Sequence, residues 1–378
     1  MKTVGIIAEF NPFHNGHQYL LNTARSRSSA DGVIVVMSGH FVQRGAGSVY
    51  SKWQRAEAAV RHGADLVLEL PTVYALQSAD YFAGGGMRIL KALDVNSVAF
   101  GVENASIDAL STLAAALHSS ASPIHTMIQT ELANGAGYSS AIASALQEFF
   151  PDFPMLPNHI LALSYIRAAM DLGFSPEWIP VTRIGALHDR EGTGHITSAS
   201  HVRKLLSEFS ASAQVFLPYP ALPPESRAEV LETMALSNLR RMDSSELSAI
   251  SGVSEGLEHR LKNAAAEANF ASFLECATTK RYSAARIRRV SFNALLNITA
   301  DQPLKAPEYL RVLAFNERGK ALIREKKDSV PIPFIIKTAD APPSQMLATD
   351  LLATDLWALS THHSKGGQDY RTSPIFLK

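Results

Sequence analysis

The chain has 378 residues, of which 46% are hydrophobic and 19% are charged, and its 35 Lys and Arg balance 35 Asp and Glu. This composition excludes a disordered or strongly charged protein, and the length favours two domains. Cys276 is the one cysteine, so we expect neither an internal disulfide nor a zinc site built from cysteines. No run approaches about 18 apolar residues and the N-terminus lacks a signal-peptide core, so a cytoplasmic protein without a membrane span is expected.

The first hundred residues alternate short apolar runs with segments of helical composition. The apolar runs cover residues 3–8, 32–37, 64–70 and 95–100, and the helical segments cover residues 17–28, 51–62 and 75–93. Continuous runs of Val, Ile and Leu are typical of parallel strands, because such strands are buried on both faces of the sheet. We therefore predict an α/β fold in which helices cover both faces of a parallel sheet.

Changes in composition divide the rest of the chain. Residues 105–171 are rich in Ala, Leu and Ser and predict helices, whereas residues 178–183 predict a strand that returns to the sheet. Beyond the prolines at 218–224 the chain is mostly helical and rich in Arg as far as residue 300. We predict a boundary there, between a domain over residues 1–224 and a mainly helical domain over residues 225–378. Within the second domain, the sequence predicts a helix over 306–315 and a strand over 331–337.

A sharp motif, FNPFHNGH at residues 10–17, lies between the first predicted strand and the first predicted helix. Gly16 lets the backbone come close to a ligand, and a helix N-terminus presents free N–H groups and the positive end of its dipole. His14 and His17 can both face that site and donate hydrogen bonds or positive charge to phosphate oxygens. Ligands of open α/β sheets bind beyond the carboxyl ends of the strands, which favours nucleotide binding here. The alternatives are a histidine pair without a role and two ligands of a metal ion.

A second motif, ITSASHVR at residues 196–203, precedes an apolar pair. Ser198 and Ser200 can cap a helix and bind phosphate, and Arg203, one turn further on, can reach the same oxygens. A capping motif of this kind is common. Together with the two histidines, however, it resembles the two-part phosphate clamp of the nucleotidyltransferases, a superfamily that includes pantetheine-phosphate and nicotinate-nucleotide adenylyltransferases.

Further motifs resemble, in order, those of the bacterial tRNA(Met) cytidine acetate ligases. They are found at residues 5–17 (GIIAEFNPFHNGH), 37–45 (MSGHFVQRG), 65–71 (DLVLELP), 77–79 (QSA), 100–103 (FGVE), 157–161 (PNHIL), 183–189 (RIGALHD) and 280–282 (KRY). The sequence departs from the family pattern at His40, where Asn is usual, at His159 and Ala162, and in a shortened segment before His188. The resemblance implies a Rossmann-like nucleotidyltransferase domain followed by a mainly helical C-terminal domain.

The family resemblance also implies a reaction. Acetate and ATP would give acetyl-adenylate and pyrophosphate, and the acetyl group would then pass to N4 of the wobble cytidine of elongator tRNA(Met). Attack of a carboxylate on the α-phosphate depends mainly on positioning and charge neutralisation, so histidine and backbone donors suffice without a protein nucleophile. The implied cofactors are ATP and the Mg²⁺ that accompanies it, and the implied partners are acetate and tRNA(Met), with neither DNA nor a membrane.

The same resemblance implies the site residues. His14 and His17 would be catalytic, binding the triphosphate and stabilising the transition state. The residues implied to bind ATP are Ile7, Ala8, Glu9, Phe10, Asn11, Pro12, Phe13, His14, Asn15, Gly16, His17, Gln18, Tyr19, Leu20, Gly101, Asn158, Arg183, Ser198, Ser200 and Arg203. Gly101 could instead be a turn glycine and Asn158 a helix cap. No metal ligand is assigned, and the roles of His40, Arg44 and Glu103 stay open. Arg44 and Lys52 could bind phosphate or lie on a solvated face.

The strongest basic cluster, residues 280–289, holds five positive charges and no acid. On a helix, Tyr282, Arg286 and Arg289 would share one face, because they are spaced i, i+4 and i+7. Such a stripe, with Lys280 and Arg281, suits an RNA phosphate backbone, and Tyr282 could stack on an unpaired base. The alternative is a solvated surface. Further basic residues expected to extend the cluster are Lys320, Arg324, Lys326, Lys327, Arg260 and Lys262.

Two other functions remain open at this point. An adenylyltransferase acting on a small phosphorylated metabolite would need neither the basic helical region nor RNA. A non-catalytic RNA-binding protein that kept the fold would bind ATP weakly or not at all, despite the two histidines.

Overall fold

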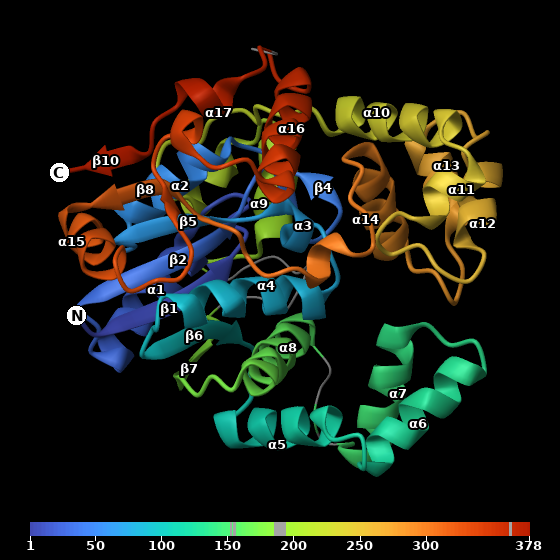
Figure 1. Ribbon diagram of the computed structural model, residues 1–378, viewed down its shortest axis with the longest axis horizontal. Helices are drawn as coiled ribbons and strands as arrows, with labels where there is room; N and C mark the ends of the chain where they lie inside the picture. Colours follow the sequence, from blue (N-terminus) through green and yellow to red (C-terminus); the bar gives the residue numbers. More distant parts are fainter. Residues whose placement is uncertain (152, 154–155, 185–193, 363–364) are drawn as a thin grey trace.

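The computed structural model describes residues 1–151, 153, 156–184, 194–362 and 365–378. Its largest sheet has the strand order β10-β8-β5-β2-β1-β6-β7, and β9 pairs with β8 (Figure 1). The parallel part consists of β1 (Thr3–Ala8), β2 (Gly32–Ser38), β5 (Leu66–Leu70), β6 (Ser97–Val102) and β7 (Glu177–Thr182). The predicted α/β fold with a parallel sheet is thus confirmed, and each strand begins within two residues of its expected start.

Helices bury both faces of this sheet. In β2, Val33 and Val35 belong to one hydrophobic core, whereas Ile34 and Val36 belong to the other, as the two-residue period of a strand requires. The first core is closed by α1 (Asn15–Ser28) and α2 (Lys52–Arg61), and the second by α3 (Thr72–Ala75), α4 (Ala79–Ala92) and α8 (Pro157–Leu172). Burial on both faces explains why the strands have continuous apolar sequences.

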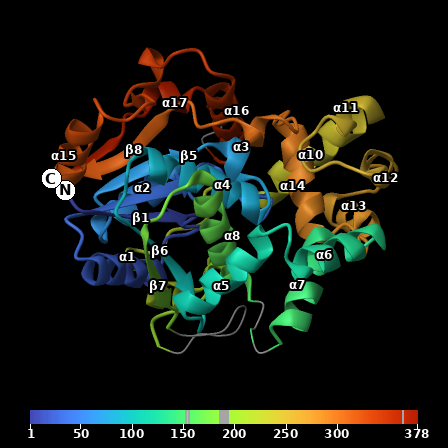
Figure 2. The ribbon, with the colours of Figure 1, turned by 60° about the horizontal axis from the view of Figure 1, so that its bottom comes forward.

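The two long regions expected to be helical do form helices, one between β6 and β7 and the other between β7 and β8. Between β6 and β8, the described helices are α5 (Ile107–His118), α6 (Pro123–Ala133), α7 (Tyr138–Phe149), α8, α9 (Ala199–Ser207), the 3₁₀ helix η1 (Ala211–Phe216), α10 (Ala228–Arg241), α11 (Ser244–Ser248), α12 (Leu257–Ala264), α13 (Phe270–Ala277), α14 (Ala284–Leu295) and the 3₁₀ helix η2 (Gln302–Leu304). The helices α10 to α14 gather at the end of the molecule opposite β10 and α15 (Glu317–Lys326) in both views (Figures 1 and 2). No helix in the described part of the chain is long and apolar enough to span a membrane.

The predicted helix over 306–315 is wrong. Residues Leu310–Asn316 form β8, which pairs antiparallel with β5, and β10 (Ile375–Leu377) then pairs parallel with β8. A short apolar run fits a buried strand as well as a helix, and here the free edge of β5 decides between them. Of the strand expected over 331–337, only β9 (Phe334–Ile335) forms. The chain therefore returns to the sheet after the helices, and a division into 1–224 and 225–378 stays a prediction.

A hairpin, a 3₁₀ helix and two α-helices complete the part of the fold that matters for the site. A short hairpin, β3 (Phe41–Val42) and β4 (Ala46–Gly47), follows β2. Near the C-terminus, the 3₁₀ helix η3 (Thr338–Asp340) and α17 (Gln368–Arg371) are held to β8 by Arg311, which donates to Thr338 and Asp369, and α16 (Gln345–Leu359) packs against α3 (Figure 1).

Candidate functional site

The turn between β1 and α1 fixes both histidines of the motif. His14 is the N-cap of α1, and its Nδ1 accepts a hydrogen bond from the Gly16 N–H at 3.0 Å. The Nδ1 of His17 accepts from the His14 N–H at 3.3 Å, and the two rings stack with centroids 3.8 Å apart. Because each Nδ1 accepts a hydrogen bond, each ring carries its proton on Nε2. A side chain at Gly16 would disturb this arrangement, since a Cβ there would lie 2.9 Å from Cε1 of His14.

Both imidazoles are neutral near pH 7. Burial, together with Arg183 and Arg203, lowers the pKa of His14 from 6.5 to about 3. Burial and the neighbouring His14 ring hold the pKa of His17 well below its usual value. Of the two roles considered from the sequence, hydrogen-bond donation through Nε2 therefore remains, and positive charge does not. No hydrogen bond within the described residues occupies either Nε2.

A cavity of about 740 Å³ lies at the carboxyl end of the parallel strands, in front of the two histidines. Most residues that sequence reasoning assigned to ATP line it together. These are Ile7, Ala8, Glu9, Phe10, Asn11, His14, Gly16, His17, Tyr19, Leu20, Gly101, Asn158, Arg183 and Ser198. The position agrees with the rule that open α/β sheets bind ligands beyond the carboxyl ends of their strands.

The other residues assigned to ATP do not line the cavity. They are Pro12, Phe13, Asn15, Gln18, Ser200 and Arg203. Phe13 is fully buried and packs edge-on against Phe10. Asn15 donates hydrogen bonds to the carbonyl oxygens of His195 and Val215, which ties α1 to the segments around α9.

The N-terminus of α9 forms a second side of the cavity. Ser198 caps this helix by accepting from the His201 N–H at 3.2 Å, and the buried hydroxyl of Thr197 has no hydrogen-bond partner among the described residues. Arg203 donates to the Asn11 carbonyl at 2.7 Å and to Ser200 at 3.1 Å, so it clamps α9 onto the first turn. Two helix N-termini thus face one cavity, an arrangement suited to anions.

The charged groups on the cavity wall are almost all positive. Arg44, whose role the sequence left open, lines the cavity and donates to the Ser200 hydroxyl at 3.0 Å. Arg183, Arg288 and Arg289 line it as well, and Glu9 is the one carboxylate among the described lining residues. Such an excess of guanidinium groups favours a polyanionic ligand.

Helix α14 brings the basic cluster to this cavity, which sequence reasoning did not foresee. Ala284, Ala285, Arg288 and Arg289 line the wall opposite α1. Arg289 lies 3.4 Å from the Gln43 carbonyl, and burial lowers its pKa to about 10, so the guanidinium stays charged near pH 7. The charge run itself was the signal for these residues, but only the tertiary fold shows that two of its arginines face the nucleotide site.

The predicted stripe of Tyr282, Arg286 and Arg289 does not exist. Tyr282 precedes α14, is buried, and donates through its hydroxyl to the Glu255 carbonyl at 3.0 Å, so its ring is not free to stack on a base. Arg286 turns away from the cavity and donates to Gly252 at 3.1 Å and to Ser254 at 2.8 Å. Lys280 is exposed, and Arg281 pairs with Glu255 at 2.5 Å.

The residues expected to extend the basic cluster do not do so. Arg260 donates to the carbonyl oxygens of Cys276 and Ala277, and Lys262 donates to those of Arg240 and Met242, so both stabilise the ends of neighbouring helices. The later basic residues lie on α15 and directly after it, far from α14 in both views (Figures 1 and 2).

Glu103 gains a role from its contacts. It follows β6 and accepts a hydrogen bond from Nδ2 of Asn158 at 2.6 Å, while its other oxygen lies 3.4 Å from Nε2 of His159. A carboxylate can only accept, so the amide nitrogen of Asn158 faces Glu103 and its oxygen is left for a ligand. Asn158 is not a helix cap, because Leu156 is the N-cap of α8.

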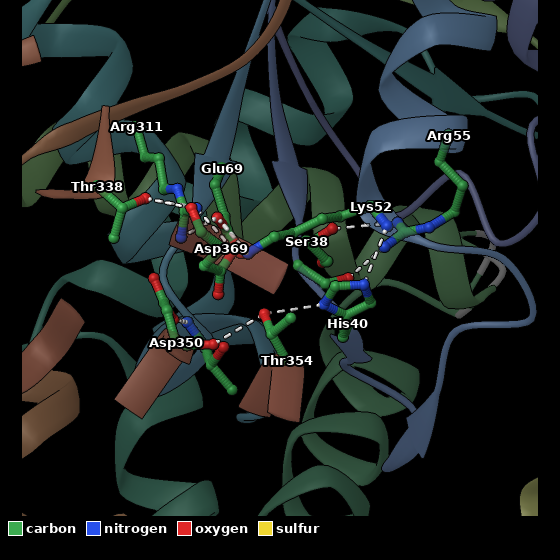
Figure 3. A network of polar contacts seen from close by, with 12 residues as sticks. Ser38, His40, Lys52, Arg55, Glu69, Arg311, Thr338, Asp350, Thr354 and Asp369 are labelled. Carbon is green, nitrogen blue, oxygen red and sulfur yellow. Dashed lines mark hydrogen bonds and ion pairs between the residues drawn. The ribbon is translucent and has the colours of Figure 1, made fainter. Parts of the chain in front are cut away.

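A cluster of buried charged side chains lies outside the lining of the cavity (Figure 3). Lys52 is fully buried and lies 2.8 Å from Glu69 and 2.9 Å from Asp369, while Arg311 lies 2.6 Å from Asp369. Lys52 therefore neither binds phosphate nor lies on a solvated face. The four side chains come from α2, β5, α17 and β8, so this cluster joins the C-terminal segment to the sheet.

His40 packs beside this cluster of charged side chains. Its Nε2 accepts from the Lys52 N–H at 3.3 Å, so Nδ1 carries the proton and donates to Thr354 at 3.1 Å (Figure 3). Its ring stacks on Trp357 with centroids 4.2 Å apart, and burial lowers its pKa well below the usual value. His188, the other histidine named for a family motif, lies outside the described residues.

These observations define a class of protein, a nucleotidyltransferase-like α/β fold with an anion-binding cavity at the first strand–helix turn. Residues 1–371 match the model of a protein family described as HIGH Nucleotidyl Transferase. The chain is 35% identical to the tRNA(Met) cytidine acetate ligase of Limosilactobacillus reuteri over the full length of both, and 34% identical to that of Bacillus subtilis over 89% of this chain and 87% of the relative. The solved structure of Thermotoga maritima TmcAL bound with alpha-thio ATP covers 100% of both chains with a TM-score of 0.91 and 30% identity.

The chain therefore belongs to the tRNA(Met) cytidine acetate ligase family, within the HIGH nucleotidyl transferases. The resemblance inferred from the motifs is confirmed, and so is the fold class that it implied.

Proposed function

We propose that the protein activates acetate with ATP and transfers the acetyl group to N4 of the wobble cytidine of elongator tRNA(Met). The observation that carries the proposal is the pair of neutral, oriented Nε2–H donors of His14 and His17 at a cavity rimmed by helix N-termini and arginines. The names of the full-length relatives and the ATP analogue in the Thermotoga maritima structure support it. ATP and tRNA as substrates also favour the cytoplasm.

In the first step an acetate oxygen attacks the α-phosphate, and the bond to pyrophosphate breaks. No proton moves in this step, so the protein has to orient two anions and offset their repulsion. We assign His14 and His17 as the catalytic donors to the phosphate oxygens, with the α9 N-terminus and Arg183 beside them. The remaining cavity-lining residues assigned to ATP, apart from Glu9, would bind its base and ribose.

Magnesium would enter this site on the phosphates of ATP. The described residues contain no group of three His, Cys, Asp or Glu side chains that could hold a metal ion. Mg²⁺ usually retains several waters and takes phosphate oxygens as ligands, so a site without a dedicated carboxylate set still accommodates it. The ion would neutralise charge on the triphosphate, and we assign it no protein ligand.

The proposal is tested with radiolabelled acetate, ATP and tRNA, each also omitted in turn. Label on tRNA(Met) that depends on ATP is the expected result. An adenylyltransferase acting on a phosphorylated metabolite would instead turn over ATP without any response to acetate or tRNA. A non-catalytic RNA-binding protein would bind tRNA and leave ATP intact.

Transfer RNA is proposed to approach from the side of α14. Of the residues assigned to tRNA, we retain Lys280 and Arg289, because Arg281, Tyr282 and Arg286 are engaged within the protein. Replacement of Arg289 with Ala should weaken tRNA binding and reduce the slope of log affinity against log salt by about 1, as expected for one lost phosphate contact. Salt-dependent filter binding measures both quantities.

The matched control for this variant is Arg324→Ala on α15, at the other end of the molecule (Figure 1). It removes the same charge but should leave both the affinity and the salt slope unchanged. Equal losses in the two variants would mean that tRNA senses only the net charge of the protein, and the docking side would then be wrong.

A further inference from the structure

The second step of the proposed reaction releases a proton, and this inference rests on that proposed function. When N4 of the cytosine attacks the acetyl carbonyl carbon, a C–N bond forms and the bond from that carbon to the phosphate oxygen breaks. AMP leaves with the electron pair, and N4 gives up one of its two protons. A positioned group that accepts this proton speeds such a step by about 10²–10⁴-fold.

The cavity wall offers few groups that can accept a proton near pH 7. The pKa of His14 is lowered to about 3 and that of His17 is also far below its usual value, so neither imidazole is an effective base there. Their Nδ1 atoms, which would receive a proton, already accept backbone hydrogen bonds. The arginines are cations, and Asn158 is not basic. Glu9 is the one carboxylate on the described wall.

The position of Glu9 fits a role in the transfer step. It follows β1 directly, and its Oε1 accepts from the Gln43 N–H at 2.8 Å, which fixes the side chain. No hydrogen bond within the described part of the chain engages Oε2. The carbonyl of the same Gln43 is the group near Arg289, so Glu9 lies toward the side of the cavity formed by α14. A base delivered past α14 would therefore meet this carboxylate.

The surroundings of Glu9 shift its pKa in opposing directions. Burial raises its pKa above 4.5, and this effect exceeds the lowering by Arg44 of the hairpin loop, Arg203 of α9 and Arg55 of α2. From α8, Tyr165 also faces it, and burial raises the pKa of that phenol, so it stays neutral. A carboxylate with a raised pKa is a stronger base than an ordinary one and is still ionised if its pKa remains below the working pH.

We propose that Glu9 is the catalytic base of acetyl transfer, taking the proton from cytosine N4 through Oε2. The first step needs no such base, because acetate attacks as an anion. The two half-reactions can therefore be affected to very different extents by one substitution.

The experiment compares wild type with Glu9→Gln, which can still accept from the Gln43 N–H but cannot take a proton. Acetate-dependent exchange of pyrophosphate into ATP measures the first step, and single-turnover transfer from enzyme-bound acetyl-adenylate to tRNA(Met) measures the second. Transfer should fall by about 100-fold or more, whereas exchange should fall far less. In wild type, the transfer rate should rise with pH through the raised pKa of Glu9, and Glu9→Gln should lose that rise. Glu9→Asp should restore part of the rate and the pH dependence.

Several outcomes would overturn the inference. Equal losses in exchange and transfer, or a raised KM for ATP alone, would make Glu9 a nucleotide-binding residue. A lower transfer rate with an unchanged pH profile would make it a positioning residue. Glu57→Gln, on the exposed side of α2, is the control and should change neither step. A wild type that shows no exchange would overturn the ligase proposal as well, and would be recognised before any variant is compared.

Discussion

Replacement of either His14 or His17 with Ala should reduce acetyl-adenylate formation by about 10²–10³-fold, the loss typical of one oriented hydrogen-bond donor in a preorganised site. The reason is geometric, since the backbone N–H bonds to both Nδ1 atoms hold the two Nε2–H groups toward the cavity before any substrate binds. Acetate-dependent pyrophosphate exchange measures the loss. Activity that survives both substitutions would show that these imidazoles do not contact the phosphates.

His14 needs a second variant because it also caps α1. Loss of an N-cap costs about 1 kcal/mol of stability, so His14→Ala alone does not separate a loss of stability from a loss of catalysis. His14→Asn supplies a good capping acceptor with a shorter side chain that cannot reach as far into the cavity. It should retain the stability of the wild type and lose activity as His14→Ala does. His259→Ala, at an exposed histidine on α12, should retain both.

The protonation state gives a further check on the same pair. An ordinary imidazole titrates near pH 6.5, and cationic histidines would lose their effect on the phosphates as the pH rises through that value. The folded-state pKa of both rings lies below it, so they stay neutral donors and their contribution to exchange should be constant between about pH 6 and pH 8. A fall in exchange across this range that disappears in the alanine variants would contradict the neutral assignment.

The local part of this site could be predicted from the sequence. The strand at residues 3–8, the turn with two histidines and the following helix are encoded within some twenty-five consecutive residues, so pattern and composition suffice. The same alternation predicted that the strands are parallel, but it does not determine their order in the sheet. What the sequence did not reveal is how the rings are protonated, because their pKa values depend first on burial in the folded protein and then on charges distant in the chain, such as Arg183.

The non-local part could not be predicted from the sequence. Residues 310–316 form a strand because they pair with the edge of β5 that faces away from β2. Arg311 is tolerated in this buried strand because Glu69 and Asp369 pair with it. The basic run at 280–289 was visible, but helical spacing could not reveal that its helix starts after Tyr282 or that Arg289 reaches the cavity. A run of charged residues in a sequence shows only that the segment is charged, because packing in the folded protein decides where each side chain points.

Replacement of Lys52 with Met should reduce the free energy of unfolding by about 3–5 kcal/mol, the loss typical of breaking a buried ion pair. Lys52 is fully buried between Glu69 and Asp369, and without its ammonium group the one described cation left within ion-pair distance of Glu69 is Arg311, at 3.5 Å (Figure 3). Urea unfolding followed by circular dichroism measures the change. The control is Arg61→Ala, which breaks an exposed pair with Glu57 and should cost at most about 1 kcal/mol.

A double variant separates the charge from the volume of the side chain. If the uncompensated carboxylate causes the loss, Lys52→Met combined with Glu69→Leu should be more stable than Lys52→Met alone, because both partners are then apolar and the pair of Arg311 with Asp369 stays intact. If the stability lost in the double variant equals the sum of the losses in Lys52→Met and in Glu69→Leu, the cluster acts through packing and not through charge. The first outcome is expected, since a buried charge without its partner costs more than the apolar replacement of both.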